Sequence, residues 1–226
     1  MSGLTLFSIV LTILVYMGAK ALSTRVRTPL TTPVLSATII LIIVLLRLDI
    51  SYEEYTPAKE WMTFLLGPAT VALAVPLYIN RRVIKARGGQ VIIGLTIGCL
   101  ATIASAVWIS KLLGLPEIIQ ATAAVKAVTT PVAIETVVII GGDPALAAAF
   151  VIAAGIFGAV FGPLLLSIFH IDDPFSRGLG MGTVSHGIGT SQAMVEGSLQ
   201  GAVSSVAMGA AAILTSIILP WLYRLF

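Results

Sequence analysis

Long apolar runs without any charged residue alternate with short polar segments along almost the whole chain. The uncharged runs occupy residues 4–19, 30–46, 61–80, 88–110, 144–169, 178–195 and 197–223. A transmembrane helix needs about 20 apolar residues, so each run is long enough, or nearly so, to cross a bilayer. The pattern predicts an all-α polytopic membrane protein that forms one integral membrane domain over residues 1–226.

The segment 117–140 departs from this pattern, because it is apolar but carries Lys126, Pro131 and Glu135. Proline removes a helical hydrogen bond, and charged groups inside a bilayer normally face protein or water. If the segment crosses fully, the chain has eight spans, and two halves, about residues 1–113 and 114–226, run parallel. If it is re-entrant, seven spans remain and the halves are inverted repeats, which the proline and the charges favour.

Charge between the runs indicates orientation. The loops at residues 20–27 and 81–87 are basic, whereas residues 47–60 hold four acids against two bases. By the positive-inside rule, the basic loops are cytoplasmic and the acidic loop is external. Only 10% of the 226 residues are charged, against roughly 25% in soluble domains, and the mean hydropathy is +1.05. These values exclude a soluble protein.

The centre of the run 178–195 has an unusual composition. Residues 180–191 contain four glycines, four hydroxyl residues and one histidine. Glycine allows close approach of a ligand, half-helix N-termini attract anions, and an ionisable group at membrane depth is a functional candidate by default. The alternative is close helix packing through small residues, with the histidine bonded to a neighbouring carbonyl. The candidate substrate contacts here are Thr183, Ser185, His186, Gly187, Gly189 and Thr190.

A second candidate site surrounds Pro131, which deprives the carbonyl four residues earlier of its helical donor and predicts a break there. Thr129 and Thr130 can satisfy freed backbone groups or bind a ligand, and Lys126 supplies positive charge for an anion. Glu135 is then a partner for Lys126 or a proton carrier. The alternative is that Lys126 snorkels and Glu135 lies at the membrane interface.

Residues 67–78 are the expected counterpart of the histidine segment. The stretch Gly-Pro-Ala-Thr-Val-Ala at 67–72 is similar to Gly-Met-Gly-Thr-Val-Ser at 180–185. Interrupted spans at matching places in two halves indicate a transporter site, so Thr70 joins the candidate contacts. Thr-Thr-Pro-Val at 31–34 also recurs at 129–132, but with a different offset. The alternative for residues 67–78 is a kinked packing helix.

These segments make the chain similar to the LrgB/CidB family over essentially its whole length. The resemblance rests on residues 50–55, 65–78, 126–133 and 182–190. Val184 and Ser191 stand where alanine is usual, and Ala127 where serine is usual. The resemblance implies a bacterial inner-membrane protein, antiholin-like or regulating murein hydrolase activity. It also implies kinship with the C-terminal part of the plastidial glycolate/glycerate translocator, small monocarboxylate ligands and a separate LrgA/CidA-type membrane partner.

We therefore expect a secondary transporter of a small monocarboxylate anion such as pyruvate, glycolate or glycerate, with His186 and Glu135 as candidates for proton coupling. The rival expectation is an antiholin-like oligomer that regulates murein hydrolase export and lysis without moving metabolites. No nucleophile elbow, Walker loop or metal-ligand spacing is present in the sequence, so we expect no enzyme activity, no cofactor and no metal. The expected surroundings are the lipid bilayer and a second copy in a dimer, without nucleic acid.

Overall fold

The computed structural model describes residues 3–26, 31–65, 68, 71 and 74–225, and these residues form helices and turns without any strand. The predicted all-α polytopic fold is thereby confirmed. Thr70 and much of the segment 67–78 lie outside the described residues. The chain divides into two compact units, Met1–Ala74 and Val75–Phe226. The two halves expected from the sequence remain a prediction.

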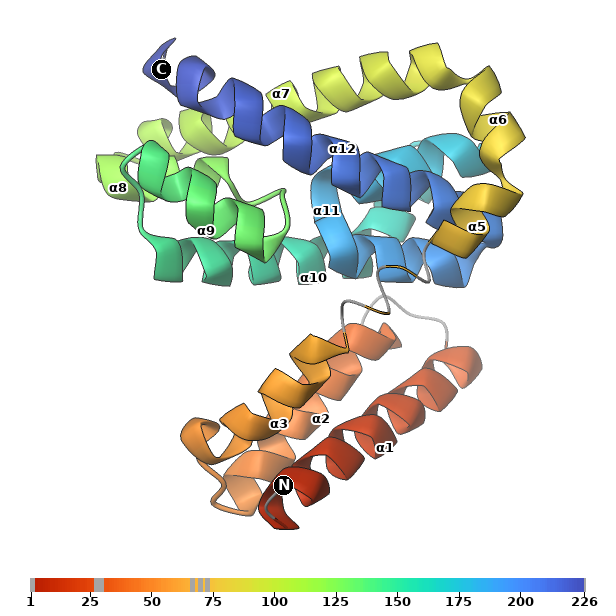
Figure 1. The fold of residues 1–226 in the computed structure, drawn as a ribbon, viewed down its shortest axis with the longest axis vertical. Helices are drawn as coiled ribbons and strands as arrows, with labels where there is room; N and C mark the ends of the chain where they lie inside the picture. Colours follow the sequence, from red (N-terminus) through yellow and green to blue (C-terminus); the bar gives the residue numbers. More distant parts are fainter. Residues whose placement is uncertain (1–2, 27–30, 66–67, 69–70, 72–73, 226) are drawn as a thin grey trace. The chain divides into compact units, whose positions relative to one another are not determined.

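Over residues 3–26 and 31–65, the first unit forms the helices α1 (Gly3–Arg25), α2 (Pro33–Arg47) and α3 (Tyr52–Phe64), and α1 packs against both of the others (Figure 1). Ser51 and Glu54 cap α3 reciprocally, with each side chain accepting from the other's backbone N–H. The Thr12 and Tyr55 hydroxyls, 3.0 Å apart, join α1 to α3. Local capping thus fixes where α3 begins, and a polar contact ties it to α1.

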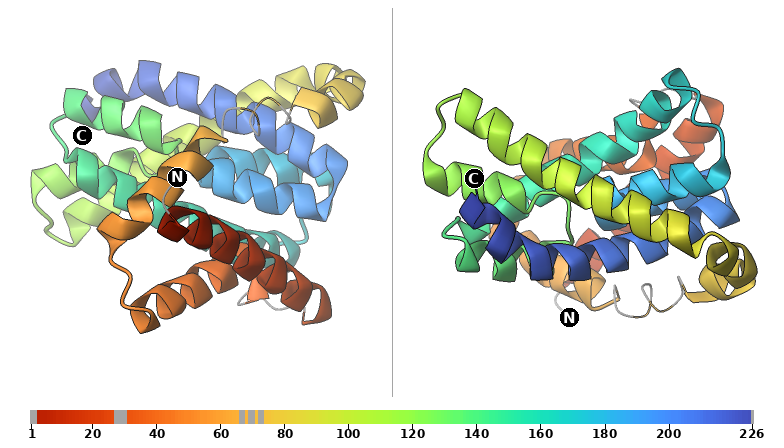
Figure 2. Two further views of the ribbon diagram at one scale, coloured as in Figure 1. Left: turned by 60° about the horizontal axis from the view of Figure 1, so that its bottom comes forward. Right: turned by 90° about the horizontal axis from the view of Figure 1, so that it is seen from above.

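The second unit is built around three long helices, α7 (Gly88–Leu112), α10 (Pro144–Ile168) and α12 (Ser198–Leu222). The remaining elements are α5 (Ala74–Ile79), α6 (Arg81–Ala86), α8 (Glu117–Ala124), α9 (Thr130–Ile139), α11 (Pro174–Glu196) and the 3-10 turn η2 (Tyr223–Leu225). The helices α7 and α12 lie across each other in the right-hand view of Figure 2. Each long helix has 25 residues and is therefore about 37 Å long.

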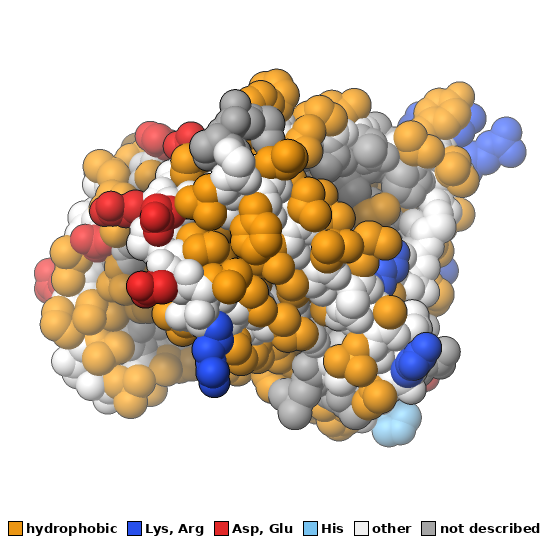
Figure 3. All heavy atoms as spheres, turned by 90° about the horizontal axis from the view of Figure 1, so that it is seen from below, with side chains coloured by type: hydrophobic (Ala, Val, Ile, Leu, Met, Phe, Trp, Pro, Cys, Tyr) orange, Lys and Arg blue, Asp and Glu red, His pale blue; other side chains and the backbone are white. Residues whose placement is uncertain are grey.

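Four helices of the described residues are long and apolar enough to cross a membrane: Gly3–Arg25, Gly88–Leu112, Pro144–Ile168 and Ser198–Leu225. Large apolar side chains stand exposed on them, such as Ile92 of α7 at 68% and Phe157 of α10 at 66%. Hydrophobic side chains also cover much of the face drawn in Figure 3. Soluble proteins seldom expose such extensive apolar surface, so these faces fit contact with lipid. The chain is an integral membrane protein.

Proline marks the start of several helices in both units. Asp143-Pro144 begins α10 and Asp173-Pro174 begins α11, and each aspartate accepts a hydrogen bond from a backbone N–H three residues later. Proline suits the first helical turn, where an N–H has no partner, and aspartate satisfies a neighbouring donor. The repeated Thr-Thr-Pro-Val sequence likewise stands at the start of α2 and of α9. These helix starts therefore depend on a few consecutive residues of the sequence.

The helices α8 and α9 form a hairpin that enters the second unit from the C-terminal end of α7 (Figure 1). The connecting residues 125–129 are not helical. The chain then returns, because the backbone N–H of Asp143, just beyond α9, donates to Thr122 Oγ1 of α8 at 2.9 Å. The re-entrant alternative for residues 117–140 is therefore the one that the structure adopts.

Helix α11 is also a hairpin, because His186 has the non-helical angles φ 40° and ψ −137°. Arg177 and Glu196 lie 19 positions apart, about 28 Å in a straight helix, yet their side chains are in direct contact at 2.8 Å. The two arms, residues 174–185 and 187–196, must therefore run back along each other. The break expected in the run 178–195 is confirmed, but that run does not cross as one straight span.

Candidate functional site

The two hairpins enter the second unit from opposite ends of α7. Arg87, just before α7, forms an ion pair with Asp173 at the base of α11, with 2.9 Å between Nη1 and Oδ2. The other hairpin begins a few residues after the last residue of α7. Because α7 is long enough to cross the unit, the hairpins point toward each other, as Figure 1 shows. The tips of both hairpins carry residues expected from the sequence to bind substrate.

Contacts along one face of α7 show that the two tips meet near its middle. Successive turns at Gly94, Gly98 and Thr102 lie against Leu179, Thr183 and Lys126, respectively. The first two neighbours belong to α11, and the third belongs to the turn between α8 and α9. One helical turn, about 5.4 Å along α7, therefore separates the contacts of the two hairpins.

His186 at the tip of α11 is buried, with 5% of its surface exposed. Its Nε2 atom lies 2.9 Å from the carbonyl oxygen of Val151 in α10. Since a carbonyl only accepts, Nε2 carries the hydrogen and Nδ1 is left to accept or to take up a proton. Val151 belongs to the same buried hydrophobic cluster as Val125 and Val128 of the opposite hairpin, so α10 bonds to one tip and shares a core with the other.

The hydroxyl residues beside His186 are used in packing contacts. Ser185 lies against α10, where a Cβ placed on Gly158 would fall 1.7 Å from Ser185 Oγ. Thr183 donates to the Leu179 carbonyl at 2.7 Å and contacts α7 at Gly98. Both threonine and serine are buried. The glycines of α7 and α10 therefore admit this arm closely, as the packing alternative anticipates.

The second arm of α11 is joined to α12 by polar contacts. Thr190 Oγ1 donates to the carbonyl of His186 and lies 2.8 Å from Ser204 Oγ of α12. Gly189 is buried against Ser185 and Met181 of the first arm. Gly187 differs from its neighbours because it is exposed. The first residue of this arm is thus accessible at the tip, next to the buried His186.

Lys126 in the α8–α9 turn is half-buried, and its Nζ donates to the carbonyl of Thr102 in α7 at 2.9 Å. Of the two roles considered for Glu135, the pairing with Lys126 is not observed: among the described residues, no carboxylate lies within 4.0 Å of Lys126. Glu135 is instead exposed on α9. The ammonium group thus points into the unit, where snorkelling would have turned it outward.

The other predicted contacts lie at the start of α9. Thr129 and Thr130 are half-buried, Pro131 is exposed, and the Thr129 side chain makes no capping hydrogen bond. The helix begins where Pro131 predicted a break. Thr70 lies outside the described residues, so the structure gives the histidine segment a counterpart in the α8–α9 hairpin and leaves the expected pairing with residues 67–78 a prediction.

The ion pair at the base of α11 is a feature that the sequence reasoning did not assign. The Arg177 guanidinium binds both oxygens of Glu196, at 2.8 and 3.0 Å, and little of either side chain is exposed. Two opposite charges at the two ends of an apolar run, 177 and 196, were the available signal. An ion pair between these two charges can be inferred only once the run is known to fold back.

The fold and the site define a class of protein: an all-α membrane protein in which two opposed helical hairpins meet inside a frame of three long helices. A match to the LrgB-like family extends over residues 12–225, and the chain belongs to this family. The resemblance stated from its motifs is therefore confirmed. No solved structure matches the chain.

Relatives of similar length occur in Bacillus and Staphylococcus. Uncharacterized protein YwbG of Bacillus subtilis is 39% identical over 215 residues, covering 95% of this chain and 96% of the relative. Uncharacterized protein YxaC of the same organism is 34% identical over 220 residues, covering 96% of each. Holin-like protein CidB of Staphylococcus aureus is 31% identical over 221 residues, covering 98% of this chain and 96% of the relative.

Proposed function

We propose that the protein is a secondary transporter of small monocarboxylate anions such as pyruvate, glycolate or glycerate. The observation that carries this proposal is the Lys126 ammonium group, which lies at the meeting point of the two hairpins with a carbonyl, and no described carboxylate, as its partner. A charge inside a membrane protein is costly without a counter-charge. A carboxylate substrate would supply that counter-charge.

The helix ends at the two tips support an anionic ligand. The second arm of α11 starts at Gly187 and α9 starts at Thr130, so both present N-termini where the hairpins meet. Such ends carry free N–H groups and a partial positive charge. In the proposed site, Lys126 anchors the carboxylate, and Thr129, Thr130, Ser185 and the N–H groups near Gly187 and Gly189 contact the rest of the substrate.

Of the two candidates for the proton carrier, His186 and Glu135, we propose His186. His186 is buried at the tip, with Nε2 bonded to Val151 and Nδ1 available for a proton, whereas Glu135 is exposed on α9. A proton gained at Nδ1 adds positive charge beside the proposed anion site and so couples proton and anion binding. A rocking or elevator movement would alternate access to this site.

The test is uptake of labelled pyruvate, glycolate and glycerate by the purified protein in liposomes, with and without a pH gradient. We expect saturable uptake that an inward proton gradient stimulates. Lys126→Gln should reduce uptake about 10- to 100-fold, the range expected for losing a hydrogen bond to a charged group. Lys111→Gln, at the exposed C-terminal end of α7, is the matched control and should leave uptake unchanged.

A second variant separates substrate binding from coupling. His186→Gln should remove the stimulation by the pH gradient while exchange of labelled for unlabelled substrate continues. The absence of saturable flux for all three acids would overturn the transport proposal, whatever the behaviour of the variants.

A holin-like role is the second candidate, and the names of the relatives favour it: the Staphylococcus aureus relative is called holin-like protein CidB. On this proposal the chain regulates murein hydrolase export and lysis as a membrane oligomer, with or without an LrgA/CidA-type partner. The same liposomes discriminate between the two proposals. Release of a trapped, membrane-impermeant dye that is indifferent to Lys126→Gln and His186→Gln, without saturable uptake, would favour the holin-like role.

The proposed location is the bacterial cytoplasmic membrane, in keeping with the bacterial relatives and the basic loops. A homodimer remains the proposed assembly. Fractionation of cells expressing a tagged chain tests the location, and cross-linking in those membranes tests the assembly.

A further inference from the structure

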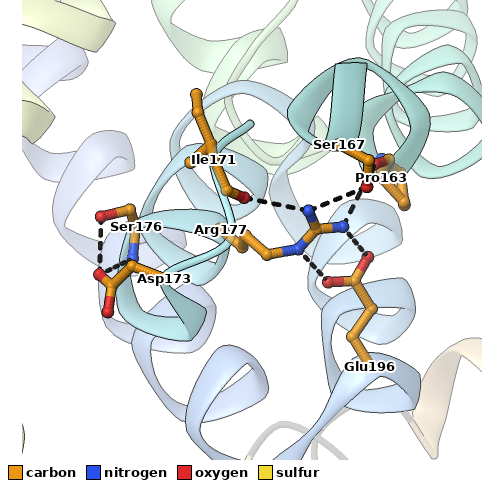
Figure 4. Close-up of polar contacts among 7 residues, drawn as sticks. All are labelled: Pro163, Ser167, Ile171, Asp173, Ser176, Arg177 and Glu196. Atoms are coloured by element: carbon orange, nitrogen blue, oxygen red, sulfur yellow. Dashed lines mark hydrogen bonds and ion pairs between the residues drawn. The ribbon is translucent and has the colours of Figure 1, made fainter. Parts of the chain in front are cut away.

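At the base of hairpin α11, the Arg177 guanidinium uses all five of its N–H donors (Figure 4). Nε and Nη2 donate to the two Glu196 oxygens at 2.8 and 3.0 Å. Nη2 also donates to the Pro163 carbonyl at 3.2 Å, and Nη1 donates to Ser167 Oγ at 3.2 Å and to the Ile171 carbonyl at 3.1 Å. Only 12% of the Arg177 side chain is exposed.

The partners of Arg177 come from three different pieces of the chain. Glu196 ends the second arm of α11, Pro163 and Ser167 belong to the last turns of α10, and Ile171 lies in the turn between α10 and α11. The guanidinium itself belongs to the first arm. One side chain therefore joins both arms of the hairpin to the helix on which they pack.

A ladder of close contacts along α10 depends on the axial position of the first arm. A Cβ placed on Gly162 would fall 2.6 Å from Met181 Sδ, and one on Gly158 would fall 2.5 Å from Ser185 Cβ. At the top of the ladder, His186 packs on Gly155 and bonds to the Val151 carbonyl. Gly155, Gly158 and Gly162 recur about one turn apart, so a slip of one turn would bring only one end of the ladder onto a side chain: Met181 would meet Leu166 in one direction, and His186 would meet Val151 in the other. The full set of close contacts is therefore made in one register.

We infer that Arg177 is a positioning residue, which sets the register of hairpin α11 on α10 and thereby holds Ser185 and His186 at the meeting point of the two hairpins. The effect of Arg177 on substrate binding rests on the proposed transport function. The effect on register does not, because it follows from the contacts of Arg177 and can be measured without any substrate.

The planar guanidinium is required for this role, and a positive charge alone is not sufficient. Lysine has one nitrogen and cannot reach carbonyls and a carboxylate on three sides in fixed directions. Exchanging the two charges, in Arg177→Glu with Glu196→Arg, keeps an ion pair but puts an acceptor opposite the Pro163 and Ile171 carbonyls, which also only accept. Neither change should restore the register.

The test is disulfide formation between cysteines placed across the ladder, in full-length protein in native membranes with Cys99 replaced by alanine. The reporter pair is Gly162→Cys with Met181→Cys, whose positions face each other in the structure. The control pair is Thr122→Cys with Gly142→Cys at the base of the other hairpin, where a Cβ on Gly142 would lie 2.9 Å from Thr122 Oγ1. Copper-catalysed oxidation rates are read from gel mobility.

We expect both pairs to form when Arg177 is present. Arg177→Lys and the charge exchange should slow the reporter pair about tenfold or more, the scale of losing one or more buried hydrogen bonds, and should leave the control pair unchanged. Glu196→Gln keeps one accepting oxygen and should slow it less. Arg87→Ala removes a half-exposed ion pair at the same base and should have no effect on the reporter.

An unchanged reporter rate in Arg177→Lys with an intact control pair would overturn the inference, and so would failure of the reporter pair to form with Arg177 in place. If the control disulfide also fails to form in Arg177→Lys, that variant has disturbed the whole fold. The milder variant Glu196→Gln is then used instead, and an unchanged reporter rate with an intact control pair would overturn the inference. Where transport is established, the variants that slow the reporter pair should also reduce saturable uptake. If no transport is found, the disulfide rates still decide the register.

Discussion

The two hairpins of the second unit both bring a polar tip to the middle of α7, but they are held in different ways. In the α8–α9 hairpin the reversal takes five non-helical residues, 125–129, and the base is joined by a neutral hydrogen bond between Asp143 and Thr122. In α11 the reversal occurs at His186 alone, and the base is joined by the ion pair of Arg177 with Glu196.

The arms of the two hairpins also differ in what they pack against. Helix α8 packs on α7 and α10, while α9 packs on α10 and α12, so these arms are held mainly by the surrounding frame. The arms of α11 touch each other directly at Gly189, whose added Cβ would meet Ser185 and the Met181 carbonyl. The arms of α11 thus contact each other as well as the surrounding helices, whereas α8 and α9 are held mainly by the surrounding helices.

The largest effect should come from crowding α11 against α12. A Cβ on Gly182 would lie 2.2 Å from the Ser204 carbonyl oxygen and 2.8 Å from its Cα, so backbone would have to move. Gly182→Ala should lower the free energy of unfolding by about 3 kcal/mol, the upper part of the range for overpacking. Gly209→Ala is the control, since nothing lies within 4 Å of its added Cβ, and it should be neutral or slightly stabilising.

Denaturant unfolding in detergent micelles, followed by tryptophan fluorescence, measures both glycine variants. Equal stabilities for Gly182→Ala and Gly209→Ala would contradict the close approach of α11 to α12.

A smaller effect is expected at the base of the α8–α9 hairpin. Thr122→Val removes the acceptor of the Asp143 N–H and should cost about 1 kcal/mol, the net contribution of a typical hydrogen bond. Thr56→Val is a matched control, because Thr56 donates to a carbonyl four residues earlier, as Thr122 does, but is only half-buried on α3. The same unfolding measurement applies, and indistinguishable variants would show that this contact does not hold the hairpin.

The smallest effect concerns pH at the base of α11. Hydrogen bonds from Ser176, and after them Arg87, lower the pKa of Asp173, the aspartate that caps α11. A lowered pKa in the folded state stabilises the protein above the unfolded value of about 3.9, and this stabilisation is lost as the pH falls through the folded pKa. Because the side chain is 42% exposed, the contribution should be only a few tenths of a kcal/mol.

Asp173→Asn keeps the cap but cannot ionise, so it is the variant to compare. The thermal midpoints of the natural protein and this variant should differ at pH 7 and converge as the pH falls below about 4. A difference that persists unchanged at the lowest pH would show that Asp173 acts through packing or capping alone.

Local chemistry explains why part of the site could be predicted. The break near Pro131, the helix starts at Asp-Pro and Thr-Thr-Pro, and the unusual composition around His186 are all features of a few consecutive residues. Lys126 and His186 stood out because an ionisable group in an apolar run needs a partner. The structure places both residues at the hairpin tips and pairs each with a backbone carbonyl. A pattern of side chains along the sequence cannot predict a partner that belongs to the backbone of another helix.

Composition and neighbours along the chain were enough to predict the apolar runs, the membrane class, the breaks and the candidate residues of the site. Packing between distant segments established that the run 178–195 folds back, that α8–α9 opposes it, and that Arg177 contacts Glu196 and α10. A straight helix and a hairpin have the same composition and nearly the same periodicity, and they differ in contacts between distant residues. Those contacts exist only once α7, α10 and α12 have formed the frame that receives both hairpins.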